Sequence, residues 1–424
     1  MTAIGRIEPA RVPARRGLFY GWVVVWAAFT VLFMSFGAAY SFTAFFNSFQ
    51  QEFGLARGST AVIFSIAVAL NFFAGAWSGK AGDRIGPKPV VLFGTLLATL
   101  GLVFAGLAER VEQVYWGYGL GVGIGVGCMY VPAIGAVQRW FVRRRATTSG
   151  LAIMGIGFGT LLGPLTAAEL IDMFGWRQAY FGLAIIVFVF GGLAALLLEN
   201  NPATRGLHPD GGDRAPTGAG TGESMTLPEA RRTAPLWLIY VSAMLVSVGL
   251  FVPFAHLVKF AQDLGLPEQQ GLLSFTMIGV GSIVGRMALG PVAQRFGVRP
   301  VVTALYFGIA GMFGWWLVSD SFWMLLVFGF VFGSLYGGFV ALAPTLVTSY
   351  YGVGHAGTLL GFVYSSVGFG CLFGPPLAGY LFDIQRSYEL PIMSAVGLCV
   401  VAAVLLMAMS SPRGFRNRHF GETH

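Results

Sequence analysis

The chain contains few charged residues. Asp, Glu, Lys and Arg make up 10% of its 424 residues, and hydrophobic residues make up 56%, whereas about 25% of a soluble globular protein is charged. So few charges cannot cover a water-facing surface of this size, and we expect the excess apolar surface to face lipid. The composition argues against a soluble enzyme, a disordered scaffold and a disulfide-rich secreted domain.

Cysteines and metal- or phosphate-binding patterns are also scarce. The three cysteines lie within apolar runs, as small core residues do (Cys128, Cys371, Cys399). The five histidines are scattered, with no metal-ligand cluster, nucleophile–base pair or ATP-binding loop around them (His208, His256, His355, His419, His424). We therefore predict no cofactor, no metal and no enzymatic activity. A membrane enzyme or receptor is an alternative class that no motif supports.

Long apolar stretches are abundant. A helix that crosses a bilayer needs about 20 mostly apolar residues, and twelve such stretches are present. They lie near 19–46, 59–80, 90–108, 114–138, 147–170, 178–198, 236–258, 269–293, 301–319, 322–349, 357–381 and 390–410. They are too long for the strands of a membrane barrel, and the first is too long for a cleaved signal peptide, the alternative there. The sequence predicts an all-α membrane protein with twelve transmembrane helices.

Basic residues are distributed unevenly between the two sides of these helices. Twenty of the 26 Lys and Arg residues lie in the tails, linker and loops on the side of the termini, and five lie on the other side. The positive-inside rule therefore predicts cytoplasmic termini, in a multi-pass protein of the cell (inner) membrane. The net charge of +8 is then a topology signal, and no nucleic-acid partner is predicted.

The predicted organisation is two six-helix bundles joined by a polar linker. The segments are a cytoplasmic tail, a bundle, a cytoplasmic linker, a second bundle and a second cytoplasmic tail (1–18, 19–198, 199–235, 236–411 and 412–424). The linker is rich in Pro, Gly and Thr, so we interpret it as a plain tether, with a regulatory role as the alternative. We expect a monomer in the lipid bilayer.

The two halves repeat each other at an offset of 211 residues. The segment "GKAGDRIGPKP" from Gly79 aligns with "GPVAQRFGVRP" from Gly290, and "GFGTLLGP" at 157–164 aligns with "GFGCLFGP" at 368–375. Two separate motifs at one offset indicate a duplicated unit. Such a repeat in a twelve-span protein is typical of secondary transporters, whose halves move about a central site near the bilayer midplane.

These motifs resemble the major facilitator superfamily over the whole chain. Its signature between helices 2 and 3 matches Gly79, Asp83, Arg84, Gly86 and Lys88. The resemblance implies two pseudo-symmetric six-helix bundles and a gating role for this loop. The resemblance implies the same gating role for the second copy of the loop (Gly290, Arg295, Gly297) and for the start of helix 5 (Arg143, Arg144). Because Gln294 replaces the acid in the second copy, we expect a weaker latch there.

A narrower resemblance is to the monocarboxylate transporter family, including its bacterial oxalate–formate antiporter branch. It is carried by "WFVRRRATTSGLAIMGIGFG" from Trp140 and by "FYGWVVV" from Phe19. "SIVGRMALGP" around Arg286 is similar to the helix 8 segment whose Arg binds the substrate carboxylate in that family.

Arg286 is the one charge predicted to lie deep within a span. It stands nine residues before Arg295, about 13 Å into a core about 30 Å thick. A charge there costs at least ~2.5 kcal/mol, so it should face the central cavity and meet an anion. A guanidinium matches a carboxylate bidentately, and no membrane acid is available. We expect it to bind a substrate carboxylate, with a packing role among carbonyls and water as the alternative.

Other side chains at similar depth are candidates for the same site. Tyr130 and Tyr364 share the depth of Arg286, whereas Tyr336 and Asn71 lie somewhat further out. A tyrosine can bond a carboxylate while its ring forms an apolar wall, and interhelical packing is the alternative for each of these residues.

The departures from the family pattern limit what can be transferred. Ser282 stands where many animal members carry an Asp, and Tyr40 is the nearest equivalent of their helix 1 Lys. Val367 aligns with the second cation of the oxalate antiporter, and a single cation favours a monocarboxylate over a dicarboxylate. Because the family's Asp and Lys are absent, the residues that usually carry protons in the family are missing here. His256 could titrate instead, with an interfacial histidine beside Lys259 as the alternative.

These observations favour a secondary active transporter of a small monocarboxylate anion, lactate- or pyruvate-like. It is expected to work by alternating access with proton symport across the inner membrane. The alternatives are an organic-anion antiporter of the oxalate–formate kind and a major facilitator exporter of a drug-like or other small molecule. Such exporters usually place acids or many amides in the cavity, and this chain has neither.

Overall fold

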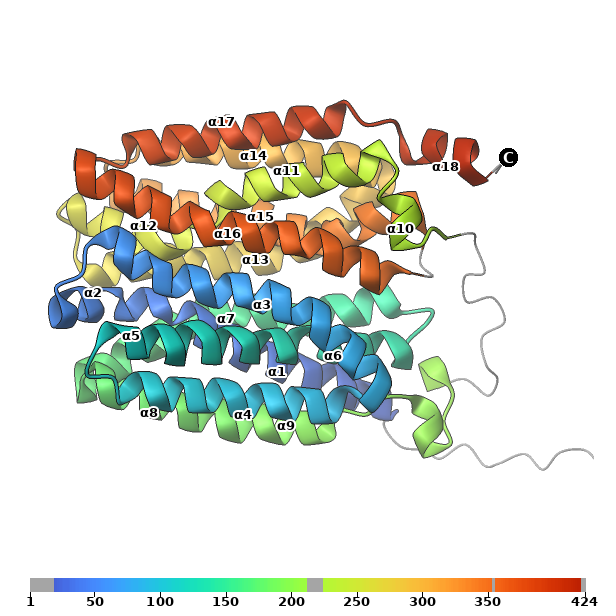
Figure 1. The fold of residues 1–424 in the computed structure, drawn as a ribbon, viewed down its shortest axis with the longest axis horizontal. Helices are drawn as coiled ribbons and strands as arrows, with labels where there is room; N and C mark the ends of the chain where they lie inside the picture. The colour runs from blue at the N-terminus through green and yellow to red at the C-terminus, as the bar shows by residue number, and fades with distance from the viewer. Residues whose placement is uncertain (1–18, 212–223, 353–354, 421–424) are drawn as a thin grey trace, which may run out of the picture.

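The computed structural model describes residues 19–211, 224–352 and 355–420 as two bundles of helices that lie side by side (Figure 1). The predicted tail 1–18 and the middle of the predicted linker fall outside these residues, as do five of the basic residues used for orientation (Arg6, Arg11, Arg15, Arg16, Arg214). The described part contains helices throughout and no strand, and twelve of its helical segments are long and apolar enough to cross a membrane. The predicted all-α membrane fold is confirmed.

The first bundle occupies the lower half of Figure 1. It consists of α1 (Tyr20–Tyr40), α2 (Phe42–Phe53), α3 (Arg57–Ile85), α4 (Pro87–Gly106), α5 (Val111–Val114), the π-helical η1 (Tyr115–Val122), α6 (Gly123–Trp140), α7 (Arg145–Phe174), α8 (Trp176–Ile186), the π-helical η2 (Val187–Gly191) and α9 (Gly192–Leu197). Consecutive pieces form single spans, such as Tyr20–Phe53 and Val111–Trp140.

The second bundle occupies the upper half. It consists of α11 (Ala234–Leu250), α12 (Val252–Asp263), α13 (Glu268–Phe296), α14 (Val298–Leu317), α15 (Phe322–Tyr351), α16 (Ala356–Gln385) and α17 (Glu389–Met407). Short elements lie outside the spans: the 3₁₀ turns η3 (Pro202–Arg205) and η4 (Pro209–Gly211), and the helices α10 (Leu227–Ala230) and α18 (Pro412–Phe420). The predicted C-terminal tail therefore contains a helix.

The predicted repeat is visible in the helix boundaries. Helices α13, α14 and α16 begin and end 211 residues after α3, α4 and α7, and α15 follows the α5–α6 span by the same offset. Both copies of the loop motif turn on a glycine with positive φ, 91° at Gly86 and 89° at Gly297, a conformation that favours glycine. The offset read from two short motifs thus extends to eight spans.

The glycine motifs in α7 and α16 lie where each helix packs closely against a neighbour. A Cβ on Gly159 would lie 2.6 Å from the backbone nitrogen of Gly37 on α1, and one on Gly370 would lie 2.7 Å from the carbonyl oxygen of Met244 on α11. Only glycine permits such close approach of two helices. The first span of each bundle is in addition interrupted at equivalent places, after Tyr40 and after Leu250.

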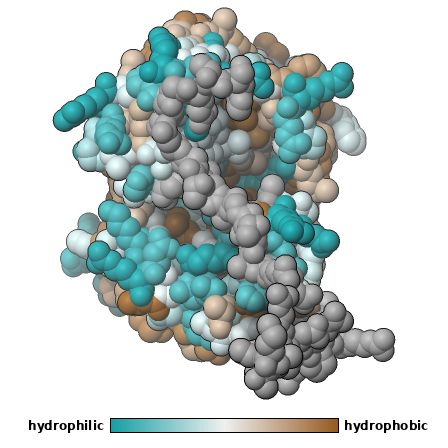
Figure 2. Space-filling view, turned by 90° about the vertical axis from the view of Figure 1, so that its right-hand side faces the viewer, coloured by the Kyte–Doolittle hydropathy of each residue, from teal (hydrophilic) through white to brown (hydrophobic). Residues whose placement is uncertain are grey.

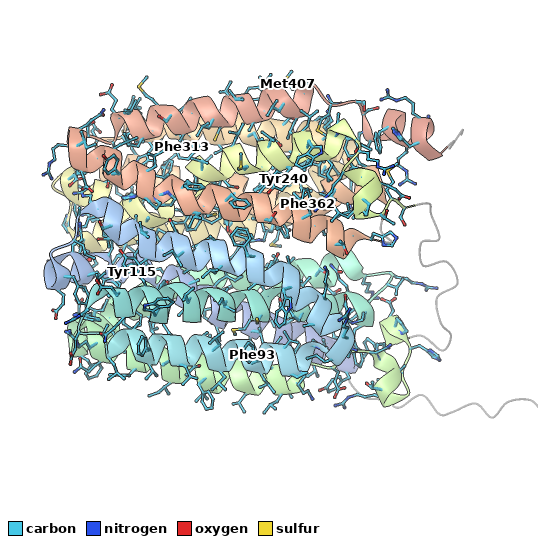
Figure 3. The ribbon with its side chains drawn as sticks, in the orientation of Figure 1. Phe93, Tyr115, Tyr240, Phe313, Phe362 and Met407 are labelled. Atoms are coloured by element: carbon cyan, nitrogen blue, oxygen red, sulfur yellow. The ribbon has the colours of Figure 1, made fainter. Side chains whose placement is uncertain are left out.

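The outer surface and the two ends of the molecule differ in polarity. Phe93 on α4 and Met407 on α17 are more than half exposed and project from the bundle, as lipid-facing side chains do (Figure 3). We call the end that carries residues 199–211 and 224–233 the linker end, and the opposite end the distal end. Hydrophilic residues gather at the linker end in an upper and a lower group (Figure 2).

Candidate functional site

Arg286 is buried in the middle portion of α13, with 8% of its surface exposed. Its Nη1 donates to the hydroxyl of Ser282, one helical turn earlier, whereas its Nε and Nη2 have no hydrogen-bond partner. Among the described residues, no acidic side chain forms an ion pair with it. A buried cation without a counter-charge is strongly unfavourable, so this guanidinium is prepared to receive an anion.

Small residues on α13 fix the position of Arg286. Gly281 and Gly285 bring the backbone of α13 against α15, where a Cβ on Gly281 would lie 2.8 Å from the backbone nitrogen of Ser334. The guanidinium carbon consequently lies 6.0 Å from the centre of the Tyr336 ring on α15. This contact holds the cation beside an aromatic face and next to the space between the two bundles.

A small cavity of about 40 Å³ lies between the bundles. It is lined by Phe36, Tyr40, Phe72, Tyr130, Ile156, Leu250, Phe251, Tyr336, Phe339, Val340, Ala343, Tyr364 and Val367. The hydroxyls of Tyr40 and Tyr336 share a hydrogen bond of 3.1 Å that joins the two bundles. The four tyrosine hydroxyls are the only polar side-chain groups of this lining. The cavity therefore suits an apolar body, with polar recognition concentrated at the tyrosines and at Arg286.

The structure brings the four predicted tyrosines together and separates the other candidates from the lining. Arg286 does not line the cavity itself but lies behind Tyr336. Ser282 is buried and accepts the bond from Arg286. Asn71 is also buried, with an unpaired Oδ1, and it occupies the position equivalent to Ser282 in the repeat. Neither Ser282 nor Asn71 lines the cavity.

The apolar lining residues were not singled out from the sequence, although the repeat could have found two of them. Phe251 is equivalent to Tyr40, and Ile156 is equivalent to Val367, each at the offset of 211. Both members of each pair line the cavity. In a pseudo-symmetric fold, a lining residue in one half is thus a useful guide to its counterpart in the other.

The bundles are joined at the distal end by Arg57, which no sequence motif singles out. Its guanidinium donates to both carboxylate oxygens of Asp263 at 2.5 and 2.6 Å, and its Nη1 also donates to the Tyr388 hydroxyl at 2.9 Å. The ring of Phe382 lies 3.9 Å from its guanidinium carbon. Arg57 begins α3 in the first bundle, whereas its partners belong to the second, so these contacts fasten the bundles together.

Asp383 adds a second connection at the same place. Its two carboxylate oxygens accept hydrogen bonds from the backbone N–H groups of Arg57 and Gly58, at 3.1 and 2.9 Å. The carboxylate therefore caps the N-terminus of α3, where free N–H groups and the helix dipole favour an anion. The described residues of the two bundles share such polar contacts only from the Tyr40–Tyr336 pair to the distal end.

His256 is fully buried in α12, next to these contacts and away from the cavity lining. Its Nδ1 lies 3.1 Å from the Tyr388 hydroxyl and its Nε2 lies 2.9 Å from the carbonyl oxygen of Pro375. The edge of its ring faces Phe46 of the first bundle. The residue predicted as a possible proton site therefore belongs to the distal closure.

The loop-motif residues lie at the linker end. Asp83 pairs with Arg139 of α6 at 2.8 Å, and Lys88 lies 3.9 Å from Glu199. In the second copy, the guanidinium carbon of Arg295 lies 5.5 Å from the centre of the neighbouring Phe296 ring, and Gln294 forms no ion pair with another described residue. The weaker latch there stays a prediction. Gly79 and Gly290 lie within α3 and α13, and the side chain of Arg84 forms no ion pair with another described residue.

The predicted gating residues Arg143 and Arg144 form hydrogen bonds through their backbone N–H groups. Their N–H groups and that of Val142 donate to the carboxylate of Asp210, which lies in the predicted linker. Partial burial tends to raise the pKa of Asp210, but these backbone N–H bonds lower it below its usual value. The first part of the linker is therefore attached to the start of α7. No group of His, Cys, Asp and Glu that could hold a metal ion occurs in the described part of the chain.

Comparisons with known proteins place this geometry among transporters. The model of the Major Facilitator Superfamily matches residues 27–316 and 246–422. Human monocarboxylate transporter 11 is 32% identical over 86% of this chain and 77% of its own length. Monocarboxylate transporter 3 of Rattus norvegicus is 31% identical over 92% of this chain and 80% of its own length.

Solved structures of the same architecture have low sequence identity. A bacterial homologue of the human lysosomal transporter Spinster, in an inward-facing and unoccupied conformation, has a TM-score of 0.66 and 14% identity. That alignment covers 94% of this chain and 98% of the other. The human organic anion transporter MFSD10 has a TM-score of 0.61 and 16% identity, over 91% and 99% of the two chains. These likenesses support the arrangement of helices.

Proposed function

The chain belongs to the Major Facilitator Superfamily and is related to its monocarboxylate transporters, and from this premise we propose that it carries a small monocarboxylate anion by alternating access. It is a multi-pass membrane transport protein and not an enzyme, as its family and relatives indicate. The observation that carries the proposal is the buried guanidinium of Arg286, with two unpaired nitrogen atoms beside the cavity.

A carboxylate fits this guanidinium for a geometric reason. Because Nη1 is occupied by Ser282, Nε and Nη2 remain as a pair of parallel donors, and a carboxylate accepts two such bonds side by side. The tyrosine hydroxyls of the cavity can bond the remaining lone pairs. Val367, where a second cation would be needed for a dicarboxylate, is apolar and lines the cavity. A single carboxylate is thus the charge that the site can neutralise.

The rest of the substrate lies against aromatic walls. Eight of the thirteen lining residues are Phe or Tyr, so the anion body makes dispersion contacts with rings and few hydrogen bonds. Because the cavity is small, short acids of the lactate and pyruvate kind satisfy this requirement best.

Alternating access follows from closure at one end and the repeat of the halves. Because Arg57 and Asp383 hold the bundles together at the distal end, we expect the cavity to open toward the linker end in this state. Rocking of the two bundles about Arg286 would break these contacts and open the distal side. We propose that the linker end faces the cytoplasm and that the protein lies in the inner membrane, because most basic residues gather at that end.

Uptake by purified protein in proteoliposomes tests the proposal. Labelled formate, acetate, lactate, pyruvate, oxalate and an aromatic acid are offered with and without an inward proton gradient. We expect saturable uptake of monocarboxylates, acceleration by the gradient, and a fall of at least about 100-fold in Arg286→Ala, since an unpaired anion in the site costs several kcal/mol.

The controls separate the parts of this proposal. Arg232→Ala removes a cation from the exposed linker and should transport as the unaltered protein does. Uptake by Arg286→Ala at the normal rate would refute the carboxylate anchor, and uptake that ignores the pH gradient would remove proton symport. Transport of oxalate only in exchange for internal anion would favour the antiporter alternative.

A further inference from the structure

The distal closure contains a chain of hydrogen bonds whose direction is fixed. The Pro375 carbonyl can only accept, so the Nε2 of His256 must carry a hydrogen and donate to it. In the neutral imidazole Nδ1 is then the acceptor, and the Tyr388 hydroxyl donates to it. The same hydroxyl oxygen accepts from Nη1 of Arg57. The order is therefore Arg57 to Tyr388 to His256, and neutral His256 is part of the closed arrangement.

A proton on Nδ1 is incompatible with this order. A protonated imidazole is a donor at both nitrogens, so the Tyr388 hydroxyl hydrogen would point at another N–H. The hydroxyl would have to turn away and accept from two cations, Arg57 and the imidazolium, which contact one oxygen. Their mutual repulsion acts in a fully buried setting, where water screens it little.

The other charged groups around His256 do not offset this effect. Asp263 is already bound by both guanidinium nitrogens of Arg57, and Asp383 by two backbone N–H groups of α3. Lys259, on the same helix as His256, adds a further positive charge next to Phe46. Phe46, on α2, offers a ring and no charge. An imidazolium could gain an acid partner only if one of these acids released α3.

We propose that protonation of His256 releases the Arg57 closure and so opens the distal end, which makes His256 the proton-sensitive element of the transport cycle. The part of this inference that concerns transport rests on the proposed function, but the opening of the distal end by protonation requires no substrate. Imidazole is the side chain that ordinarily titrates near neutral pH. A proton would enter from the distal solution onto Nδ1 and leave by the same nitrogen once the ring faces solvent again.

A reporter cysteine measures this opening directly. Thr43 is buried where the bundles meet, and its hydroxyl donates to the Phe254 carbonyl of the other bundle at 2.9 Å. The three native cysteines are buried. In Thr43→Cys, labelling by a membrane-impermeant maleimide from the distal side should become faster as pH falls, by up to about tenfold per pH unit for one titrating site. Rates are corrected with a model thiol at each pH.

Two variants identify the group that responds. His256→Gln keeps an amide donor for Pro375 and an acceptor for Tyr388 but does not titrate, so labelling should stay slow at every pH. Tyr388→Phe removes the hydroxyl that connects the imidazole with Arg57, so labelling should be faster and nearly independent of pH. Unchanged pH dependence in folded His256→Gln would overturn the proposal, as would a Thr43→Cys reporter that labels equally at pH 5.5 and 7.5.

The same reporter in Arg286→Ala distinguishes this inference from the proposed function. The distal network does not include Arg286, so acid-dependent labelling should persist there even though carboxylate uptake is lost. If uptake by the unaltered protein fails while labelling responds to pH, the substrate proposal is wrong and the proton-sensitive closure stands. If uptake is normal while the labelling rate does not change with pH, the substrate proposal stands and the proton-sensitive closure is wrong.

Discussion

Helices α3 and α13 are equivalent in the repeat, yet their cations stand at different depths. At the distal end, α3 begins with Arg57 whereas α13 begins with Glu268. In the middle portion, α3 has Gly75 where α13 has Arg286. The two copies of this helix therefore differ in function: α3 joins the bundles at the distal end, and α13 places a cation near the cavity.

The interfaces that these helices form differ in the same way. Asp383 of α16 caps α3, but among the described residues the equivalent Asp172 of α7 forms no hydrogen bond or ion pair with α13. Close approach is possible in the first case because a Cβ on Gly379 would lie 2.7 Å from Gly58, whereas Ala168 occupies the equivalent of Gly379. At the positions equivalent to Arg57 and Asp383 this interface has two acids, Glu268 and Asp172, which cannot form the same closure, so pseudo-symmetry of backbone does not imply symmetry of gating.

The largest effect is expected at the central cation. Arg286→Lys keeps the charge of α13 but replaces the pair of parallel donors by one ammonium group. Carboxylate uptake should retain its selectivity for anions while kcat/KM falls about tenfold or more, since one charge-assisted bond of about 1.5–3 kcal/mol is lost. Initial uptake rates over a range of concentrations give this ratio. Full activity of the lysine variant would show that charge alone suffices.

The next largest effect concerns the cation of α3. Arg57→Ala removes the bonds to Asp263 and Tyr388 together, and the distal-open state should gain population by about tenfold or more, equivalent to ~1.4 kcal/mol. Labelling of Thr43→Cys from the distal side measures it. Arg177→Ala, which breaks an ion pair with Glu52 inside the first bundle, is the matched control and should leave labelling unchanged.

A closure can also be added where the molecule has none. Glu268→Arg places a cation at the equivalent of Arg57, opposite Asp172, so the two distal interfaces become more alike. Because an exposed ion pair contributes about 0.2–1 kcal/mol, labelling of Thr43→Cys should slow by at most about fivefold. Faster labelling in this variant would contradict the comparison between the two interfaces.

The smallest effect is expected at the linker. Asp210 has a lowered pKa in the folded protein, so its contribution to stability is present above its ordinary pKa near 3.9 and is lost as pH falls through the lowered value. The attachment to α7 should thus be constant from pH 5 to 8. Asp210→Asn should lower Tm by less than about 2 °C at pH 7 and make no difference near pH 2, as thermal unfolding can measure.

Much of the fold followed from the sequence because membrane helices have a simple signature. Apolar length located all twelve spans, and two short motifs gave the offset that the helix boundaries repeat. Depth selected Tyr130 and Tyr364 and, somewhat further out, Tyr336, since residues at similar depth converge when helices surround one cavity. Tyr40 and Ser282 were selected from the family resemblance. Depth does not determine rotation about the helix axis, and for this reason Asn71 was placed at the site although it lies off the lining.

The distal closure could not be predicted from the sequence. Arg57 meets partners 206 to 331 positions away, and nothing in the local pattern pairs an arginine in one loop with acids at the ends of two other helices. At the surface of a membrane protein, such an arginine looks like any other loop cation. The place of His256 in this closure could not be predicted for a similar reason, because its partner Tyr388 precedes a different span.

Equilibrium binding of a labelled monocarboxylate to the purified protein tests the central claim most directly, since binding needs neither gating nor a proton gradient. The carboxylate is competed with its uncharged primary amide of nearly the same shape, in the unaltered protein and in Arg286→Ala. Our account predicts saturable binding that the acid displaces and the amide does not, and loss of that binding in the variant. Equal binding in both proteins, or displacement by the amide as effective as by the acid, would contradict it.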